Sequence, residues 1–466
     1  MNVRLRPSDR RSRFGGIGLG WGLIDQGFSS ATNFGLSVLA GRLLGPDGLG
    51  TVFIGFATYL LILEFQHSLL QDPLAISAPS AEDVLPVRSA LTIAFTYQVA
   101  ATIGMAVLGM LLPGDFGRGL LLMAPWMIPL LLQDFCRTVL FRDRRGGLAT
   151  ACDGVWALGM AVTLPLVLIH RTEVAVVACW GIGALFGAVL GMAAIRLRPN
   201  GARESWHWWK ADITPLARWL GLESAALVLG TQGGIFLTAA LVGAGNLGGL
   251  RAVQSAFAPM TLVGPAMRMP GLPAIARATR DDSSEEGRKV AISIARRLSF
   301  TALVLVVSYF LVLIVAGRPI LSLMFGKAFV HFRALILPVG LGQVSGASAL
   351  GFYILLKATG RGRAVFKARL ITAVATFALI GLLASGGSVS GAAWGASYGA
   401  AAGWISVAFD AFRRPRSRDA GDEQPELPYS GDTSIDLAIS LPIASMKDHL
   451  AGAVLTADRA TLRREP

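Results

Sequence analysis

Acidic and basic side chains lie within the apolar stretches of this sequence, where they can bind ions or exchange protons. Asp25 stands in the stretch "GWGLIDQGFSSATNFGLSVLAGRLLG", and Glu64 and His67 follow in the next one. Glu223 and Arg268 hold comparable places in the second half of the chain. Charge in a lipid environment is costly unless it is paired or functional. We therefore identify Asp25, Glu64 and Glu223 as candidate ion-coupling residues, and we predict the pairs Asp25–His67 and Glu223–Arg268.

Small polar residues accompany Asp25 along one face of the same stretch. The residues that recur at the helical period are Gly22, Gln26, Ser29, Asn33 and Ser37, with Thr32 alongside. Lipid offers no hydrogen-bond partners, so this stripe is expected to face protein or a water-filled cavity. Close helix packing would explain the small residues, but it explains Asp25 poorly.

The composition is that of a membrane protein with many helices. The chain has 466 residues, of which 53% are hydrophobic and 15% charged, and its mean hydropathy is +0.57. Soluble proteins carry about 25% charged residues. The net charge of +13 comes mainly from arginines at the ends of apolar segments, so it indicates orientation in a membrane rather than nucleic-acid binding.

The apolar segments can be counted, because a helix needs about 20 apolar residues to cross a bilayer. Twelve segments are predicted, at 18–41, 49–70, 89–112, 119–140, 148–169, 174–195, 216–242, 249–274, 293–317, 333–356, 366–385 and 389–411. They predict an all-α polytopic protein with both termini on one side of the membrane. If both termini are cytoplasmic, 35 of the 42 Lys and Arg residues lie on that side, as the positive-inside rule expects.

The two halves of the chain resemble one another at an offset of 198 positions. Trp21 then matches Trp219, and Asp25 matches Glu223. Six segments per half predict parallel repeats, which would form two six-helix lobes around a central cavity. The predicted organisation is a basic cytoplasmic segment (1–17), an N-lobe (18–195), a cytoplasmic interlobe connection (196–215), a C-lobe (216–411) and a disordered cytoplasmic tail (412–466).

Neither a metal nor a cofactor is expected from the motifs. Cys136, Cys152 and Cys179 lie in or beside apolar segments without CxxC spacing or a neighbouring His cluster, so no disulfide or metal site is predicted. The glycine run "GGIGLGWG" resembles a dinucleotide-binding loop, but no strand precedes it and an apolar segment follows.

One motif connects the chain with a known family. Residues 21–62 contain the pattern N-F-x-L-S-x-L-x-x-R-L-L-G-P, which ends at Pro46. Together with "LGGLRAVQSAFAPMTLV" (247–263), they resemble the polysaccharide-transport branch of the multidrug/oligosaccharidyl-lipid/polysaccharide (MOP) exporter superfamily. The resemblance implies a flippase that moves a lipid-linked oligosaccharide across the bacterial cytoplasmic membrane by alternating access. Such substrates are precursors of O-antigen, lipopolysaccharide or exopolysaccharide.

The resemblance also implies a set of substrate contacts. In such transporters a cationic cavity accepts the pyrophosphate–sugar head, so Arg42, Arg251 and Arg268 are the implied phosphate contacts. Asn33 and His67 complete the predicted cavity set; His67 stands where related chains often have arginine, and its imidazole is cationic only part of the time near neutral pH. The implied partners are the lipid-linked substrate, H⁺ or Na⁺ as coupling ion, membrane lipids and polysaccharide-assembly proteins.

Four other functions are weighed against this one. A drug–cation antiporter of the same fold would favour a cavity of carboxylates and aromatic rings, whereas arginines accompany the acids here. A lipid II flippase generally has fourteen segments. A membrane-embedded polysaccharide polymerase or ligase needs a sizeable outward loop, and the longest outward connection is 318–332. A membrane scaffold would not explain the polar stripe, so we predict a transporter rather than an enzyme.

Overall fold

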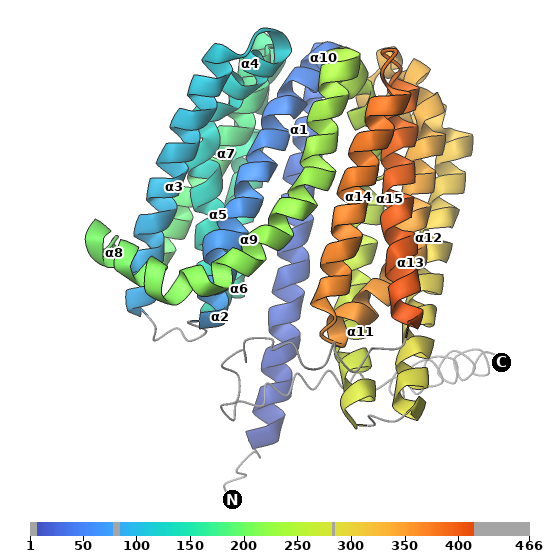
Figure 1. Cartoon of the computed structure of the whole chain (residues 1–466). Coiled ribbons are helices and arrows are strands. Elements are labelled where there is room, and N and C mark those ends of the chain that lie inside the picture. The colour runs from blue at the N-terminus through green and yellow to red at the C-terminus, as the bar shows by residue number, and fades with distance from the viewer. Residues whose placement is uncertain (1–6, 78–83, 282–284, 414–466) are drawn as a thin grey trace, which may run out of the picture. The chain divides into compact units, whose positions relative to one another are not determined.

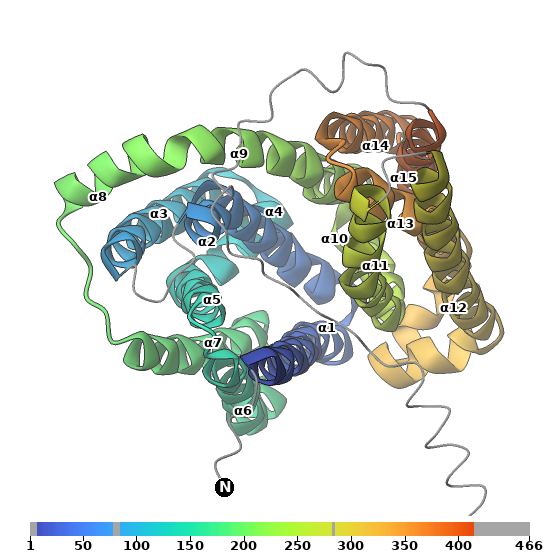
Figure 2. The same cartoon turned by 90° about the horizontal axis from the view of Figure 1, so that it is seen from below.

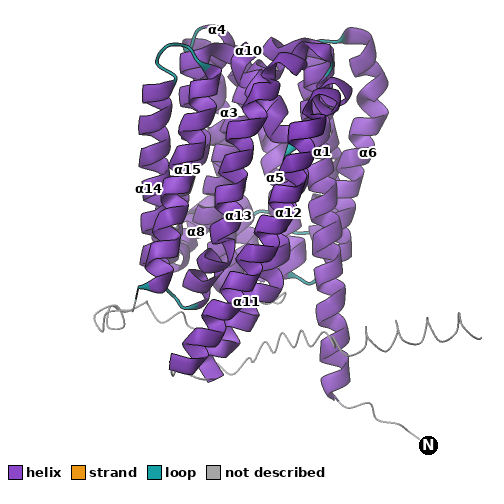
Figure 3. Ribbon diagram, turned by 90° about the vertical axis from the view of Figure 1, so that its right-hand side faces the viewer, coloured by secondary structure: helices purple, strands orange, loops and turns teal. Residues whose placement is uncertain are grey.

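The computed structural model describes residues 7–77, 84–281 and 285–413, and within these ranges the chain is helical, without a β-strand (Figure 3). Contacts divide the chain between residues 20 and 21 and again between residues 416 and 417, and the description below concerns Trp21–Arg416. The predicted tail (412–466) lies almost wholly outside the described residues.

The described residues form fifteen α-helices (Figure 1), and some of these are joined by short π-helical or 3-10 turns, which we label η. In chain order the elements are α1 (Pro7–Gln66), η1 (His67–Gln71), α2 (Asp72–Ser77), α3 (Val84–Leu111), α4 (Gly114–Met123), η2 (Ala124–Trp126), α5 (Met127–Arg142), α6 (Gly146–His170), α7 (Glu173–Ile195), α8 (Ala202–Trp208), η3 (Trp209–Ile213), α9 (Thr214–Val228), η4 (Leu229–Gly233), α10 (Gly234–Ala256), η5 (Ala258–Leu262), α11 (Val263–Asp281), α12 (Glu285–Phe325), η6 (Lys327–Leu335), α13 (Ile336–Ala358), α14 (Gly362–Leu383) and α15 (Val389–Phe412).

Each of the twelve predicted segments lies on helix for most of its length. Among the described residues, nine helical stretches are long and apolar enough to cross a membrane, judged by length and composition. The predicted boundary between the first two segments falls at Gly45, where two helices meet across a kink within α1. The boundary between the seventh and eighth segments likewise lies inside α10.

Glycine forms the kink at which two helices meet, both in α1 and in α10. Gly45 in α1 has φ 74°, and Gly243 in α10 has φ 79°. Side chains with a Cβ atom rarely adopt this left-handed region, so glycine is the residue suited to both bends. The two kinks are 198 positions apart, which is the offset of the sequence resemblance between the halves. We call the end of the helix bundle that carries both kinks the kink end, and the opposite end the basic end.

The helices gather in two groups. In the first, α7 packs against α5 and α6; in the second, α13 packs against α12 and α15, and α14 against α15. Figure 2 shows α8 running beside α3 and α9 passing on to the second group. Because α8, η3, α9, η4 and α10 follow one another without a loop, the two groups are joined by a bent, continuous helix.

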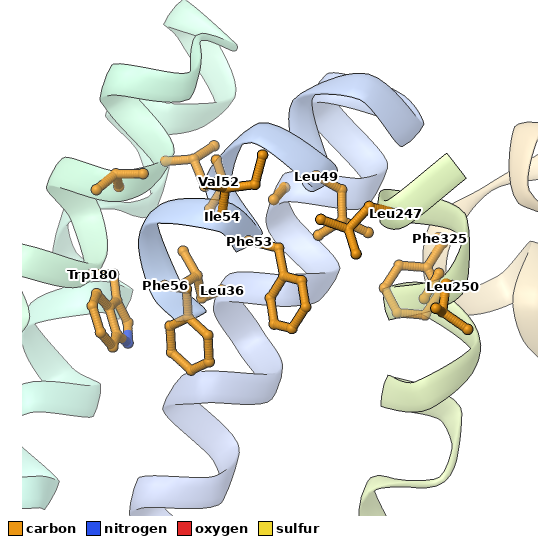
Figure 4. Packing of buried hydrophobic residues seen from close by; sticks show 14 of the residues in the cluster. Leu36, Leu49, Val52, Phe53, Ile54, Phe56, Trp180, Leu247, Leu250 and Phe325 are labelled. Atoms are coloured by element: carbon orange, nitrogen blue, oxygen red, sulfur yellow. The ribbon is translucent and has the colours of Figure 1, made fainter. Parts of the chain in front are cut away.

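The largest hydrophobic cluster crosses from one group to the other near the kink end (Figure 4). Phe53 and Phe56 of α1 lie between Trp180 of α7 and Leu250 of α10, and Phe325 of α12 closes the far side. Residues from both halves therefore share one core.

Backbone contact between α1 and α10 is reciprocal at the kink end. A Cβ atom at Gly50 would lie 1.8 Å from the carbonyl oxygen of Ala244, and one at Gly248 would lie 1.9 Å from that of Pro46. Gly50 and Gly248 are 198 positions apart, as are Pro46 and Ala244. Glycine at both positions lets the two helices touch along their backbones, in matching ways.

Candidate functional site

A network of polar side chains lies inside the N-lobe, built from four elements. Asp25 comes from α1, and His67 and Gln71 come from the π-helical turn η1. Helix α5 contributes Gln133, Asp134, Arg137 and Thr138, which share one helix face because they are spaced by one and four residues. Asp153 comes from α6. Asp25 is about 30 Å along the helix from the Gly45 kink, so the network lies toward the basic end.

Arg137 is the centre of this network. Its Nη1 donates to Oδ2 of Asp25 at 2.9 Å, and its Nη2 donates to Oδ1 of Asp134 at 2.8 Å. Nη1 is also 3.7 Å from Oδ2 of Asp153. One guanidinium therefore faces three carboxylates, and its planar fork can serve two of them at hydrogen-bond distance.

Asp134 is the most heavily bonded carboxylate. Besides Arg137, Nε2 of His67 lies 2.6 Å from its Oδ2, and Nε2 of Gln71 donates to the same oxygen at 3.1 Å. Thr138 in turn donates to Oε1 of Gln71 at 2.7 Å. The π-helical turn brings His67 and Gln71 to the same acceptor, a use of irregular helix that is frequent at functional sites.

Asp153 is held more loosely than its neighbours. Nε2 of Gln133 donates to its Oδ1 at 2.5 Å, whereas its Oδ2 is buried without a hydrogen-bond partner among the described residues. Oδ1 of Asp25 is likewise buried without a hydrogen-bond partner among these residues. Two carboxylate oxygens in the network are thus free to take a proton or a small cation.

The network carries more acid than base. Three carboxylates face one guanidinium and one imidazole, so it is negative unless His67 is charged and a carboxylate is protonated. The side chains of Asp25, Asp134 and Asp153 are 5%, 6% and 2% exposed, whereas that of His67 is 30% exposed. Protons or cations can therefore reach the network most directly at His67.

The interlobe helix touches this network from outside. Nε1 of Trp209 donates to the carbonyl of Leu69, inside the turn that carries His67 and Gln71, at 3.2 Å. Ser224 of α9 donates to Oε1 of Glu64 at 3.0 Å. Movement of the interlobe helix would therefore act on the turn that holds the partners of Asp134.

A second feature, between the lobes, is an arginine without an anionic partner. The guanidinium carbon of Arg251 in α10 lies 4.3 Å from the ring centre of Phe53 and 5.7 Å from that of Phe56. Its Nε is buried and has no hydrogen-bond partner among the described residues. Arg251 and Phe53 are 198 positions apart, which is the offset of the predicted repeat.

The predicted pair Asp25–His67 is wrong, because Arg137 lies between the two side chains. Asp25 bonds to Arg137, and His67 bonds to Asp134. The side chain of Glu223 lies outside the described residues. The exposed Arg268 forms no ion pair with any side chain that the structure describes.

Two other predicted residues have identifiable surroundings. Arg42 donates from Nε to the carbonyl of Met324 at 3.0 Å and from Nη2 to that of Leu323. These carbonyls belong to the last turn of α12, where helices leave acceptors unsatisfied, so Arg42 caps that helix. Oδ1 of Asn33 is buried, with no hydrogen-bond partner in the described ranges.

The sequence analysis missed Asp134, Arg137 and Asp153. The sequence did contain a signal for all three residues. The stretch "QDFCR" (133–137) interrupts one apolar segment, and Asp153 interrupts another. Arg137 stands near the end of the predicted segment 119–140. Its place one turn after Gln133 and Asp134 would have assigned it to their helix face.

The fold can be compared with solved structures. No protein-family model matches the sequence, and no curated protein matches it. A lipid II flippase MurJ in an inward closed conformation has a TM-score of 0.64, with 14% identity over 84% of this chain and 87% of that one. A multidrug resistance MATE family transporter of the MOP superfamily, inward-facing, has a TM-score of 0.62, with 10% identity over 82% and 93%.

The chain has the fold of a MOP-superfamily transporter. A third structure with this fold, a MOP superfamily transporter from Pyrococcus furiosus, has a TM-score of 0.56, with 10% identity over 83% of this chain and 92% of that one; its binding pocket is described as of reverse polarity. These structures are described as a flippase or as transporters.

Proposed function

We propose that the protein is a flippase that carries a lipid-linked oligosaccharide, joined to its lipid through phosphate, from the cytoplasmic to the outer leaflet of a bacterial cytoplasmic membrane. The polar head would cross between the lobes while the lipid tail stays in the bilayer. Both termini would lie in the cytoplasm, so the basic end would be the cytoplasmic one. The branch of the superfamily and the glycan are part of this proposal.

The observation that carries the proposal is the unpaired guanidinium of Arg251. A half-buried cation without a carboxylate is costly, and stacking on Phe53 compensates only part of that cost. A phosphate that enters between the lobes would supply the missing acceptors, since guanidinium binds phosphate through two parallel hydrogen bonds. Arg268 of α11, also without an ionic partner in the described ranges, is the second proposed contact.

Alternating access is supported by the contact at the kink end. The helices α1 and α10 touch there through backbone at Gly50 and Gly248, with no large side chain between them. Such a contact can separate and reform as two rigid groups rock. We infer that it closes the outer side while substrate enters from the cytoplasmic side.

Energy for the cycle would come from an ion gradient acting on the N-lobe network. The free oxygens of Asp25 and Asp153 can take H⁺ or Na⁺, and binding there would weaken the hold of Arg137. Glu64, bonded to Ser224 of α9, would carry the change to the interlobe helix. Glu223 remains a candidate for the equivalent role in the C-lobe.

A drug–cation antiporter is the second candidate function. The acid excess in the N-lobe favours it, because three carboxylates could attract a cationic drug. Against the antiporter function, each of these carboxylates already bonds to neighbouring side chains, and all three side chains are almost fully buried. The choice between flippase and antiporter depends on whether Arg251 or the acid network faces the transported molecule.

Transport by the purified chain in liposomes tests the proposal. A lipid-linked oligosaccharide with a pyrophosphate bridge and a fluorophore on its sugar would be quenched from outside by a membrane-impermeant reductant. We expect the protein to expose the inner-leaflet half of the probe. The variant Arg251→Gln should slow this at least tenfold, because it removes a charge-assisted hydrogen bond to phosphate.

The matched control is Arg297→Gln, which removes an exposed arginine from α12. It should leave the rate unchanged. Equal rates for Arg251→Gln and the control would contradict the role of Arg251. Ion-driven uptake of a cationic dye, with no movement of the lipid-linked probe, would establish the antiporter instead.

A further inference from the structure

Arg42 of α1 reaches from one lobe to the end of a helix in the other. Its Nε donates to the carbonyl of Met324 at 3.0 Å, and its Nη2 donates to the carbonyl of Leu323. Both carbonyls belong to the last turn of α12. The contact lies at the kink end, because Arg42 comes just before the Gly45 kink of α1. A single side chain therefore connects the two lobes beside the bend.

The residue before Arg42 brings the same two helices close together. A Cβ atom at Gly41 would lie 2.5 Å from a ring carbon of Phe325, the last residue of α12. Phe325 belongs to the hydrophobic cluster that crosses between the lobes (Figure 4). Glycine at position 41 thus leaves room for the ring of Phe325, while the guanidinium of Arg42 meets the carbonyls of the two residues before it.

The charge of Arg42 is matched by the end of a helix rather than by a carboxylate. Its partners are the two carbonyls, and no described carboxylate pairs with it. The C-terminal end of a helix carries a partial negative charge, so a cation is favoured there. After Phe325 the chain turns away at Gly326, which has φ 102°. The end of α12 is therefore open to a donor from the other lobe.

Exposure makes this contact reversible. The side chain of Arg42 is exposed, so water can hydrate the guanidinium as soon as it leaves the carbonyls. Arg137 in the N-lobe network differs, because its release would leave buried carboxylates without their cation. The contact of Arg42 can therefore break and reform during a conformational cycle, whereas that of Arg137 holds one lobe together.

Other arginines bond to the ends of helices, but within one lobe. Nη1 of Arg145 donates to the carbonyl of Ala194 in the last turn of α7 at 2.9 Å. Nη1 of Arg361 donates to the carbonyl of Asp410 in the last turn of α15 at 2.6 Å. Each of these pairs joins residues of the same half of the chain. Arg42 differs from both because its hydrogen bonds cross from one half to the other.

We propose that Arg42 is a latch that keeps the kink end closed, and that it must leave the carbonyls of α12 each time this end opens. The inference rests on the proposed transport cycle, whose regulation it concerns, but not on Arg251 or on the transported molecule. The latch is one-sided, because the position 198 residues after Arg42 is Ala240. Breaking it should favour the state that is open at the kink end and, as rigid lobes rock, closed at the basic end.

Distances between spin labels test the latch in the full chain, reconstituted in lipid nanodiscs without substrate. One label pair, at Asp115→Cys in α4 and Ser385→Cys between α14 and α15, reports on the kink end (Figure 1). A second pair, at Arg144→Cys and Lys289→Cys, reports on the basic end. All four positions are exposed, and the three native cysteines are buried, so the labels should attach at the introduced sites.

Arg42→Gln should raise the population of long distances at the kink end at least fivefold, because charge-assisted hydrogen bonds are lost. The population of short distances at the basic end should rise at the same time. Arg42→Lys keeps the charge but not the planar fork, so it should give an intermediate population. The matched control is Arg145→Gln, which removes an arginine from a helix end within the N-lobe and should leave both distance distributions unchanged.

Unchanged distances at the kink end in Arg42→Gln would overturn the proposal, since Arg42 would then only cap α12. Equal broadening of the distributions at both ends would overturn it as well, because a loss of structure would explain that result. If Arg42→Gln does not fold, Arg42→Lys carries the test against Arg145→Lys. Longer distances at the kink end with none changed at the basic end would support the latch but contradict alternating access, so the two proposals fail separately.

Discussion

The N-lobe network and the pair of Arg369 and Tyr353 in the C-lobe place charge inside a helix bundle in opposite ways. In the N-lobe, Arg137 is surrounded by carboxylates, and almost every polar group bonds to another within the network. In the C-lobe, Nη2 of Arg369 in α14 donates to the hydroxyl of Tyr353 in α13 at 2.9 Å. In the first arrangement the cation is paired with acids of the chain, whereas Arg369 has no carboxylate partner among the described residues.

The two halves share features of their backbone but differ in their ionisable side chains. The backbones share kinks at Gly45 and Gly243 and touch reciprocally at Gly50 and Gly248. The ionisable side chains do not follow the same offset, because the positions 198 residues after Asp134 and Arg137 are Phe332 and Leu335. Both halves have the backbone kink, but each half has its own arrangement of ionisable side chains.

Removing Arg137 should have the largest effect on stability. Arg137→Gln leaves three buried carboxylates without their shared cation, at an expected cost of about 3–5 kcal/mol. Thermal unfolding in detergent measures it. Arg144→Gln, an exposed arginine in the following turn, is the control and should change the midpoint little. A small loss of stability in Arg137→Gln would mean that the network does not depend on its guanidinium.

Alanine at either glycine of the kink end should force the lobes apart there. Gly50→Ala and Gly248→Ala place Cβ atoms against backbone oxygens, which cannot move aside as a side chain can. A cysteine introduced at Asn246 should then react with a water-soluble maleimide about tenfold faster, each 1.4 kcal/mol of lost contact energy giving a factor of ten.

The control for this experiment is Gly104→Ala in α3, where a Cβ atom would have nothing within 4 Å. Cys136, Cys152 and Cys179 are buried, so they should add little background. A similar increase of the maleimide reaction rate in both glycine variants would support the equivalence of the halves. Acceleration in one variant alone would show that the reciprocal contact is not mechanically symmetric.

The three carboxylates of the network should differ in their importance. Asp134→Asn disturbs bonds to His67, Gln71 and Arg137 and should cost about 3 kcal/mol, since bonds to charged groups are worth about 1.5–3 kcal/mol. Asp153→Asn should cost about 1 kcal/mol or less, because Arg137 is 3.7 Å away. Thermal midpoints of the two variants would rank them, and a reversed order would contradict the network as described.

Tyr353→Phe should have the smallest effect on stability, about 1 kcal/mol or less. The hydroxyl makes one hydrogen bond to a half-buried arginine, and the ring itself remains. Thermal unfolding in detergent measures this. A loss as large as that of Asp134→Asn would show that the pair of Arg369 and Tyr353 is a closed structural unit like the N-lobe network.

The sequence predicted the helices because hydrophobicity and length decide where they form. The kinks at Gly45 and Gly243 were not predicted, although they are separated by the same offset of 198 positions. The predicted boundary near Gly45 also holds, because glycine followed by proline is a common signal for a turn between helices. At Gly45 the backbone leaves the helical region, and two helices meet there across a kink.

Side-chain partners were harder to predict than helices. Asp25 and His67 lie at similar depth, but depth alone does not say which helix lies between them, and α5 inserts Arg137 there. Arg42 was assigned to phosphate because of its type, whereas the end of α12 provides carbonyls for it. Both cases depend on which helices are neighbours, and a single sequence does not contain that information.

The hydrogen bond from Trp209 to the carbonyl of Leu69 has a consequence for assembly. The loop-like break nearest to the middle of the chain is at 196–201, before α8. A chain cut in that break would leave α8 and Trp209 on the C-terminal fragment, although both rest against the N-terminal one. Two separately made fragments would thus be able to associate through this contact. The order in which they are synthesised would matter little to the finished protein.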